Sequence, residues 1–591
     1  MTETIQPLSE YYDADAEFES LPSAGRALEP VRQRLGLIVG GSLSRGLEVR
    51  LAREINTEEL AVGSYSVVHG DRKRFFSMIT DVQLGASSEE IALNPPAVDD
   101  DFLRQIHLGT SAFGLVHLSP MLVLEEGAQD PRPVKTIPGH FSEVRAAGQD
   151  EVDEIFGPEG PDKQRDTYFF HVGEPLDMED VKITLDLKRL VERSSGVFGK
   201  TGTGKTFLSR LLLAGIIHAD AAVNLVFDMH NEYGWEGSSE GVTTRVKGLK
   251  QIFPDGRVSI FTLDDESSRR RNSNPDYTIT IGYDQIEPDD LEMLRGIFNL
   301  SEAQIGAIYA LHRRIGKQWL ANFLDDKWIE SWGDPEEGPG ASGLKGLADA
   351  MGQTYQTLAA LRRRFERFRR YGFLVPKAQS DTIDYLFKHL DNGTSVVLEF
   401  GRYGNSLDAY LFVANFLTRR LHRKYVVKKE NAFGDRAEEP RPLVITIEEA
   451  HKFLDPAIAS HTIFGTIARE LRKYNVTLLV VDQRPSRIDP EVMSQIGTRV
   501  TALLDEESDI HAVLMGVSGA AGLREVLARL DTRQQALILG HAVPMPVVVH
   551  TRSYDLGFYK AMGFRDEEEL PGQFEANVTS MRGDEDFEGF D

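Results

Sequence analysis

The sequence predicts an α/β protein in which a small β-barrel precedes a parallel-sheet domain, and an α-helical insertion interrupts that domain. Short apolar alternations broken by turns fill residues 31–125, which is typical of a small barrel or sandwich. From about residue 181, β-branched strands alternate with helices at long separations, the pattern of a parallel sheet. At 591 residues the chain is too long for a single core, so several units are expected.

Changes in composition and periodicity divide the chain into seven segments. They are an acidic flexible arm (1–30), the β-barrel (31–125), a linker or loop region (126–180), the first part of the sheet domain (181–285), the helical insertion (286–390), the second part of the sheet domain (391–558) and an acidic tail (559–591). Residues 1–20 and 566–591 carry −6 and −9 of the net charge of −26. The charge therefore lies mostly at the ends, and it neither supports nor excludes binding of nucleic acid.

Apolar runs bounded by turn residues give the expected strands, and longer runs without proline give the expected helices. The barrel strands are expected at 35–39, 47–51, 64–68, 75–82, 113–118 and 121–124. The sheet strands are expected at 191–198, 223–227, 395–400, 443–447, 477–481 and 499–504. The helices are expected at 207–217 and, in the insertion, at 291–298, 302–320 and 344–371.

Cysteine content and hydropathy indicate the cellular compartment in which the protein is expected. The chain has no cysteine, which excludes disulfides, thiolate metal sites and cysteine nucleophiles. No segment reaches the roughly 18 apolar residues needed to span a bilayer, and residues 1–20 lack the basic region of a signal peptide. We expect a cytoplasmic protein without a membrane partner.

The most specific motif is the sequence GKTGTGKT at 199–206, which matches G-x-x-x-x-G-K-[ST] between an expected strand and an expected helix. Backbone N–H groups and the positive end of a helix can wrap a polyphosphate there. Lys205 is expected to reach the β and γ phosphates, and the Thr206 hydroxyl to bind Mg²⁺. A glycine-rich turn before a core helix is the alternative, but it leaves the Gly-Lys-Thr ending unexplained. The expected nucleotide-binding residues are Gly199, Thr201, Gly202, Thr203, Gly204, Lys205, Thr206 and Phe207.

Two carboxylates end the expected strand at 443–447, and such a pair can serve a nucleotide-bound metal and an attacking water. Glu448 is expected in the Mg²⁺ shell, and Glu449 is expected to polarise the hydrolytic water. Gln483, at the end of the neighbouring strand, is the candidate sensor of the γ phosphate. The alternatives are a strand that ends in solvated acids and an amide that caps the next turn.

Arg469 and Arg472 lie three residues apart on one face of an expected helix. Guanidinium groups there could stabilise phosphoryl-transfer charge, including that of a neighbouring subunit. A salt-bridged surface helix is an equal alternative.

A further acid cluster follows the second sheet strand, where Asp228, His230 and Glu232 are candidates to line the site. His230 has no partner pattern that would make it a metal ligand. A guanine-reading N-K-x-D motif is absent from the sequence, which favours ATP over GTP.

Two basic stretches could contact DNA. The triplet Arg269, Arg270 and Arg271 lies in a polar, loop-like segment, and residues 362–370 form an arginine-rich helical stretch. For the triplet, a phosphate contact in a pore and an ordinary surface loop are equal alternatives. For 362–370, a solvated face of the insertion is favoured.

Taken together, these motifs resemble the HerA family of hexameric DNA translocases, in the HerA–FtsK branch of RecA-like ATPases. The resemblance rests on the 199–206 loop, Asp228-x-His230-x-Glu232-Tyr233, Ile447-Glu448-Glu449-Ala450-His451, the Arg469/Arg472 helix and Asp482-Gln483-Arg484-Pro485-Ser486 followed by Gln495. It implies a homo-hexameric ring with DNA in a central channel and ATP between neighbouring subunits. It also implies a partner, either a NurA-like nuclease or a defence effector such as a sirtuin-like NAD-consuming enzyme. Glu448 stands where many members have Asp, which puts direct coordination of the metal in doubt.

The leading hypothesis is an ATP-driven double-stranded DNA translocase or helicase, in DNA end processing or antiphage defence. The alternative is an ATPase ring that assembles and regulates a partner effector with little DNA movement of its own. A small-molecule kinase is a third class, but it leaves the barrel and the arginine helix without a role.

Overall fold

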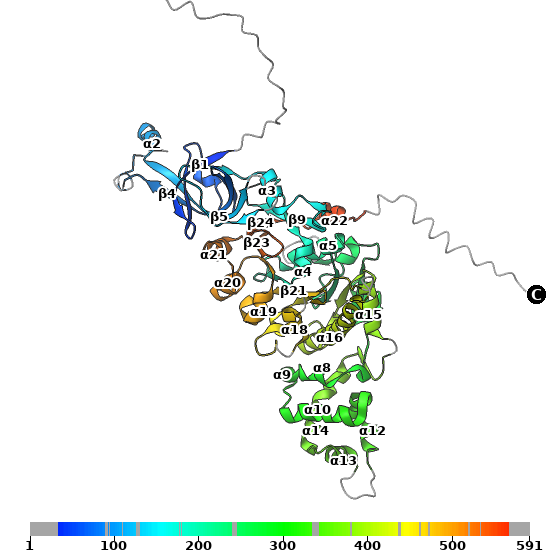
Figure 1. Ribbon diagram of the computed structural model, residues 1–591. Helices are drawn as coiled ribbons and strands as arrows, with labels where there is room; N and C mark the ends of the chain where they lie inside the picture. Colours follow the sequence, from blue (N-terminus) through cyan, green and yellow to red (C-terminus); the bar gives the residue numbers. More distant parts are fainter. Residues whose placement is uncertain are drawn as a thin grey trace, which may run out of the picture.

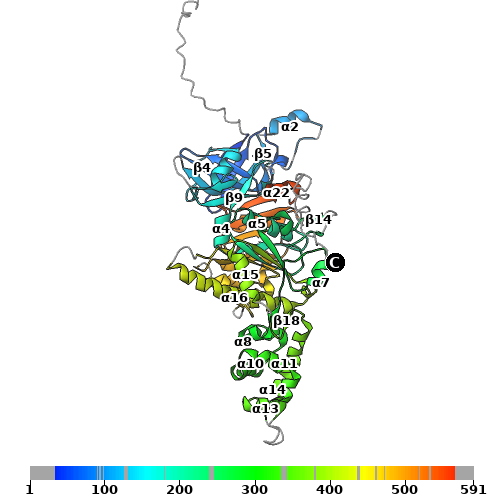
Figure 2. The same cartoon turned by 90° about the vertical axis from the view of Figure 1, so that its right-hand side faces the viewer.

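The computed structural model describes residues 33–565 apart from short gaps, at 89–90, 92, 94, 98, 109, 126–130, 177, 179, 239–244, 334–341, 379–380, 435–438, 460–461, 471–472, 518–519 and 532–533. Three parts follow one another along the long axis of the molecule: a β-barrel, a large sheet covered by helices, and a group of helices at the far end (Figures 1 and 2). The expected arm at 1–30 lies outside the described residues, as does the tail from 566 onward. The α/β fold class predicted from the sequence is confirmed.

The barrel is closed by six of the described strands. Their order is β2 (Gly46–Leu51), β1 (Arg34–Ser42), β7 (Glu143–Ala146), β3 (Tyr65–His69), β4 (Lys73–Ala86) and β5 (Ala112–Glu125), and β5 pairs back with β2. Alternate side chains face opposite sides, so Phe75 packs inside the barrel while Phe76 packs against the sheet domain. The barrel is therefore anchored on the sheet domain through one face.

One long strand, β5, replaces the two strands expected at 113–118 and 121–124. The chain passes through Ser119 and Pro120 without a turn, because the register of the β4–β5 pair shifts there. Proline is tolerated in a sheet at such a bulge.

Residues 126–180, expected as a linker, supply strands to both sheets. β7 completes the barrel, and β9 (Thr167–Pro175) pairs with β10 (Ile183–Asp186) and with β24 (Val547–Thr551) of the large sheet. The helix α3 (Gln149–Phe156) lies between them. This segment is rich in glycine and charge, β7 has only four residues, and β9 is a buried run without regular apolar alternation, so neither strand was recognised in the sequence.

The large sheet has a parallel centre and an antiparallel margin. Its parallel strands run in the order β22 (Thr498–Thr501), β11 (Ser195–Phe198), β21 (Val476–Asp482), β20 (Leu443–Glu448), β12 (Val223–Asp228), β19 (Ser395–Glu399), β15 (Val258–Thr262) and β16 (Tyr277–Thr278). On the other side of β22, β23 (Gln535–Gly540) and β24 lead to β9 antiparallel. Residues 191–194 belong to the end of helix α4 (Leu187–Glu192) and a short turn, so β11 begins later than expected.

The helical insertion consists of short helices rather than the three long ones expected. It contains α8 (Pro288–Glu292), α9 (Arg295–Phe298), α10 (Glu302–Ile315), α11 (Trp319–Leu324), α12 (Asp326–Glu330), α13 (Gly343–Ala350) and α14 (Tyr355–Phe365). The expected helix at 302–320 is interrupted at Gly316, whose φ of +78° ends α10. Gly352, at φ +66°, separates α13 from α14 in the same way.

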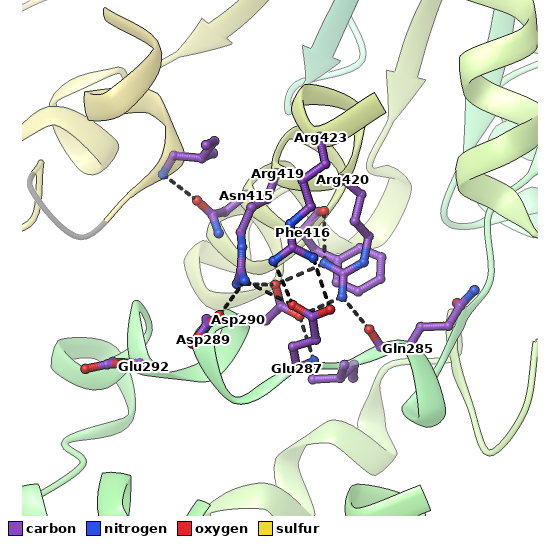
Figure 3. Close-up of polar contacts among 12 residues, drawn as sticks. Gln285, Glu287, Asp289, Asp290, Glu292, Asn415, Phe416, Arg419, Arg420 and Arg423 are labelled. Carbon is purple, nitrogen blue, oxygen red and sulfur yellow. Dashed lines mark hydrogen bonds and ion pairs between the residues drawn. The ribbon is translucent and has the colours of Figure 1, made fainter. Parts of the chain in front are cut away.

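One attachment of the insertion to the sheet domain is the long helix α16 (Leu407–Ala432). Figure 3 shows three arginines of α16, Arg419, Arg420 and Arg423, converging on the acidic residues of α8. Asp290 is fully buried and accepts hydrogen bonds from Arg419 Nη1 (3.1 Å) and from Arg420 Nη2 (2.8 Å). The guanidinium of Arg420 also lies 3.6 Å from the ring centroid of Phe416. These contacts fix the first helix of the insertion against α16 of the sheet domain.

The chain after residue 558, expected to lack a core, still contributes to one. Helix α22 (Leu556–Ala561) packs beside α5 (Lys205–His218), and Tyr559 and Met562 are buried. Figure 1 shows α22 next to α5 and β9. Among the described residues, no helix is both long enough and apolar enough to cross a membrane.

Candidate functional site

The phosphate loop, residues 199–206, connects β11 to α5 at the carboxyl edge of the parallel strands. Gly202 and Gly204 have φ of +79° and +90°, a left-handed conformation in which glycine carries no steric penalty. A Cβ added at either position would meet nothing within 4 Å, so the space beside the loop is open. The loop therefore presents its backbone to an open volume at the start of α5.

The side chains of the loop are held by local contacts. Lys205 Nζ donates to the Lys200 carbonyl at 2.9 Å, and Thr203 Oγ1 donates to the same carbonyl at 2.8 Å. Thr206 Oγ1 donates to Glu232 Oε2 at 3.0 Å. Lys200 itself pairs with Asp505, beyond β22. Phe207 contacts Tyr554 edge to face at 6.1 Å between ring centroids, so it faces the packing around α22.

The order of the sheet brings the predicted polar residues to the same edge. β21 lies directly beside β11, and Phe198 pairs with Asp482; β20 lies next, and Glu448 pairs with Val481. Since all of these strands are parallel, their carboxyl ends meet on the side of the phosphate loop, where ligands of open α/β sheets bind.

Glu448 is held by two buried tyrosines. Tyr233 donates from its hydroxyl to Glu448 Oε1 at 3.2 Å. The Tyr410 hydroxyl accepts from the Glu448 N–H at 3.1 Å and donates to its carbonyl at 3.1 Å. Glu448 Oε2 is buried and has no hydrogen-bond partner in the structure. Burial, together with the charges of Asp228 and Glu232, raises the pKa of Glu448 well above its ordinary value.

These residues fit a bound Mg²⁺. An unpartnered buried carboxylate oxygen beside other acids is stabilised by a cation, and oxygen ligands are those that Mg²⁺ prefers. The Thr206 hydroxyl and Glu448 would hold the ion, which would neutralise phosphate charge.

Glu449, Gln483 and Thr201 form a continuous chain of hydrogen bonds. Thr201 Oγ1 donates to Gln483 Oε1 at 2.6 Å, and Gln483 Nε2 donates to Glu449 Oε1 at 3.0 Å. The predicted water-polarising carboxylate and the predicted sensor are thus in direct contact, and both connect to the phosphate loop.

Asp228, His230 and Glu232, which follow β12 and were expected to line the site, have three different positions in the structure. Asp228 is buried and accepts the backbone N–H groups of Glu232 (2.8 Å) and Tyr233 (2.9 Å), so its carboxylate closes the turn. That turn directs Glu232 to Thr206. His230 is exposed at the edge of the same turn.

Arg469 lies at the opposite edge of the sheet. It is on helix α18 (Ile463–Glu470), pairs with Glu491 at 3.1 Å, and lines a cavity of about 440 Å³ together with Ser194 and Thr477, which lie at the amino ends of β11 and β21. It therefore does not face the phosphate loop of its own chain. Arg472 lies outside the described residues.

The basic stretches are largely engaged in contacts within the chain. The Arg269–Arg271 triplet, expected in a loop, lies at the end of helix α7 (Asp265–Arg270): Arg269 pairs with Asp265 at 3.0 Å, Arg270 pairs with Glu266, and Arg271 pairs with the buried Glu399 at 2.9 Å. A helix forms because Asp264 caps it by accepting the Ser267 N–H.

The arginine-rich stretch at 362–370 divides in the same way. Arg362 and Arg364 are partly buried and bind groups on α10 to α12 of the insertion; Arg369 also donates to α11 but is exposed, as are Arg363 and Arg370.

Sequence reasoning did not find the tyrosines that hold Glu448. Tyr233 was visible as part of a motif, but nothing in the sequence indicates that its hydroxyl reaches a carboxylate 215 positions away. Tyr410 lies inside an ordinary helical pattern. An alignment of relatives would be the signal able to single it out.

Residues 170–421 match the family model described as "Helicase HerA, central domain". A DNA double-strand break repair helicase HerA from Pyrococcus furiosus is 24% identical over 70% of this chain and 73% of its own length. Its counterpart from Sulfolobus acidocaldarius is 22% identical over 88% of this chain and 93% of its own length. The solved structure of VirB4 from Thermoanaerobacter pseudethanolicus is 14% identical and superposes with a TM-score of 0.41 over 68% of this chain and 98% of its own. The matched region runs from β9 through the phosphate loop and the whole insertion into α16, so this part of the chain is similar to the central domain of HerA helicases.

Proposed function

We propose that this protein is an ATP-driven double-stranded DNA translocase or helicase that works in the cytoplasm as a ring of six identical subunits. The observation that carries the proposal is the chain of hydrogen bonds from Thr201 through Gln483 to Glu449, which links the phosphate loop to a carboxylate able to polarise water. Similarity to HerA supports DNA as the polymer, because the curated relatives are named DNA double-strand break repair helicases.

Within one subunit, the backbone of the phosphate loop and Lys205 bind the polyphosphate of ATP. Glu449 accepts a proton from the attacking water. Gln483 contacts the γ phosphate and, through its hydrogen bond to Glu449, couples the position of that carboxylate to the presence of the phosphate. Lys205 and Thr206 must leave their present partners, the Lys200 carbonyl and Glu232, to reach the nucleotide. Each site therefore rearranges its own hydrogen bonds when ATP binds.

Between subunits, Arg469 supplies positive charge to the site of a neighbour. Its place at the amino edge of the sheet supports this role, since it faces away from its own phosphate loop. Arg472, two positions after the last helical residue of α18, is the second candidate. A head-to-tail contact of this kind generates a closed ring when its rotation closes.

The ring acts on DNA together with a separate enzyme. Arg269 and Arg270 are the candidates for phosphate contacts, because their guanidinium groups stay largely exposed while Arg271 is anchored. The partner is a NurA-like nuclease or a defence effector such as a sirtuin-like NAD-consuming enzyme, in DNA end processing or antiphage defence. These partners rest on the family resemblance.

Three variants test the site. Lys205→Ala should abolish ATP hydrolysis, and Glu449→Gln should bind ATP while turnover falls by about 10²- to 10⁴-fold. Lys188→Ala is the matched control, because this exposed lysine pairs with Asp166 at the amino edge, away from the loop. Turnover by Glu449→Gln at the rate of the unmodified protein would refute the catalytic assignment.

The DNA and ring parts of the proposal are tested separately. We expect a hexamer by mass measurement, DNA-stimulated hydrolysis, and binding of double-stranded DNA that weakens steeply with salt. A hexamer that hydrolyses ATP without binding DNA at low salt would instead indicate a ring that assembles and regulates a partner.

A further inference from the structure

The backbone of Glu449 adopts a conformation that a residue with a side chain avoids. Its φ is +48°, in the left-handed region, where the Cβ atom crowds the following carbonyl. Such a conformation persists only where surrounding contacts fix it. Residue 449 follows the last residue of β20, so the chain turns sharply at the proposed water-polarising carboxylate.

The contacts that fix this turn come from Asp482, the last residue of the neighbouring strand β21. Its Oδ2 accepts the His451 N–H at 2.6 Å and the His451 imidazole Nδ1 at 2.9 Å, and its Oδ1 accepts the Arg484 N–H at 2.7 Å. The Asp482 side chain is fully buried, whereas that of His451 is 19% exposed. The bond to Asp482 raises the pKa of His451, which favours a charged imidazolium beside this carboxylate.

The same turn determines where the Glu449 carboxylate lies. Asp482 holds the residue two positions after Glu449, and Gln483, the residue after Asp482, donates to Glu449 Oε1. His451 Nδ1 also lies 3.7 Å from Glu449 Oε2. The two strand ends are therefore tied at two adjacent points, one through Asp482 and one through Gln483.

We propose that His451 and Asp482 are positioning residues for ATP hydrolysis, which hold Glu449 in its left-handed turn and so aim its carboxylate at the water that attacks the γ phosphate. This inference rests on the proposed function. Neither residue touches the nucleotide in this role; both act through Glu449. The Thr201–Gln483–Glu449 chain requires this placement, because Gln483 can bridge only if the glutamate side chain stays at the end of β20.

The test removes and restores the donor of His451. His451→Leu keeps the bulk and the backbone N–H bond to Asp482 but loses the imidazole bond, whereas His451→Asn retains a nitrogen donor at the position of Nδ1. We expect kcat of His451→Leu to fall about 10- to 100-fold, with KM for ATP and equilibrium binding of ATPγS changed less than about twofold. His451→Asn should recover most of the loss. Asp482→Asn, which keeps one acceptor oxygen, is the second variant if His451→Leu does not fold.

A double-mutant cycle separates positioning from a structural role. If His451 acts through Glu449, His451→Leu should have little further effect on the residual single turnover of Glu449→Gln. Equal fold losses in the two backgrounds, or wild-type kcat in His451→Leu, would overturn the inference. A Glu449→Gln protein with wild-type turnover would instead overturn the proposed function itself.

Discussion

The carboxyl group of Asp228 links the stability of the protein to pH. The group is fully buried, and burial together with the charge of Glu399 raises its pKa from 3.8 to about 7. The folded state thus keeps this proton over a pH range in which the unfolded chain has lost it. Stability from this group is therefore lost as pH rises from about 4 to 7, the opposite of a salt-bridged aspartate.

The size of the effect follows from the two pKa values. A shift of one unit corresponds to about 1.4 kcal/mol, so the penalty at Asp228 grows by about 3 kcal/mol between pH 5 and pH 8. Asp228→Asn removes this titration. We expect the free energy of unfolding of the variant, relative to the unmodified protein, to improve by about 3 kcal/mol over that interval.

The assay is urea denaturation at pH 5 and pH 8 without nucleotide or divalent cation. The Asn variant loses part of the hydrogen bonding to Glu232 and Tyr233, but that loss is similar at both pH values. Asp289→Asn is the matched control, because Arg419 and Tyr309 keep the pKa of Asp289 below its ordinary value despite partial burial. A stability difference for Asp228→Asn that does not change between the two pH values would refute the reasoning.

Two further predictions concern the junction and the ring. Asp290→Ala should destabilise the protein by about 3 kcal/mol, because Arg419 and Arg420, both mostly buried, each lose their buried carboxylate partner, although Arg419 keeps Glu287 and Asp289. Asp289→Ala, at a half-exposed carboxylate, should cost about 1 kcal/mol or less by thermal unfolding. Equal losses would contradict this role for Asp290. Mixing Arg469→Ala subunits with Lys205→Ala subunits should restore part of the ATPase activity if Arg469 completes the site of a neighbour. Activity that stays at the sum of the two separate proteins at every ratio would exclude a role in trans.

The sequence alone was sufficient to predict those parts of the site whose residue types follow one another at a fixed local spacing. The phosphate loop, the acidic end of β20 and Gln483 follow from motif spacing and from strands whose carboxyl ends must share one edge. The helical insertion was visible as a long stretch without strand patterns, although its breaks at Gly316 and Gly352 were not, since only the backbone shows that these glycines are left-handed.

Other features depend on pairings between distant segments. β7 has only four residues, and β9, although nine residues long, is buried on both faces and lacks a regular alternation; their places are set by neighbours in the barrel and in the large sheet. The segment of the arginine triplet was predicted to be a loop because it is polar, and nothing in that composition indicated that Asp264 caps a helix. The ion pair between Arg271 and Glu399 joins residues 128 positions apart, so the local sequence could not indicate it.

The sequence by itself determined the α/β class, the nucleotide loop, the acidic pair and the resemblance to HerA, because each depends on residue type at fixed local spacing. The tertiary structure alone decided how these residues are held: Tyr233 and Tyr410 around Glu448, Asp482 at His451, and Arg469 on the edge away from its own loop. Hydrogen bonds of this kind depend on distances between strand ends, which strand order and register fix and local sequence does not encode.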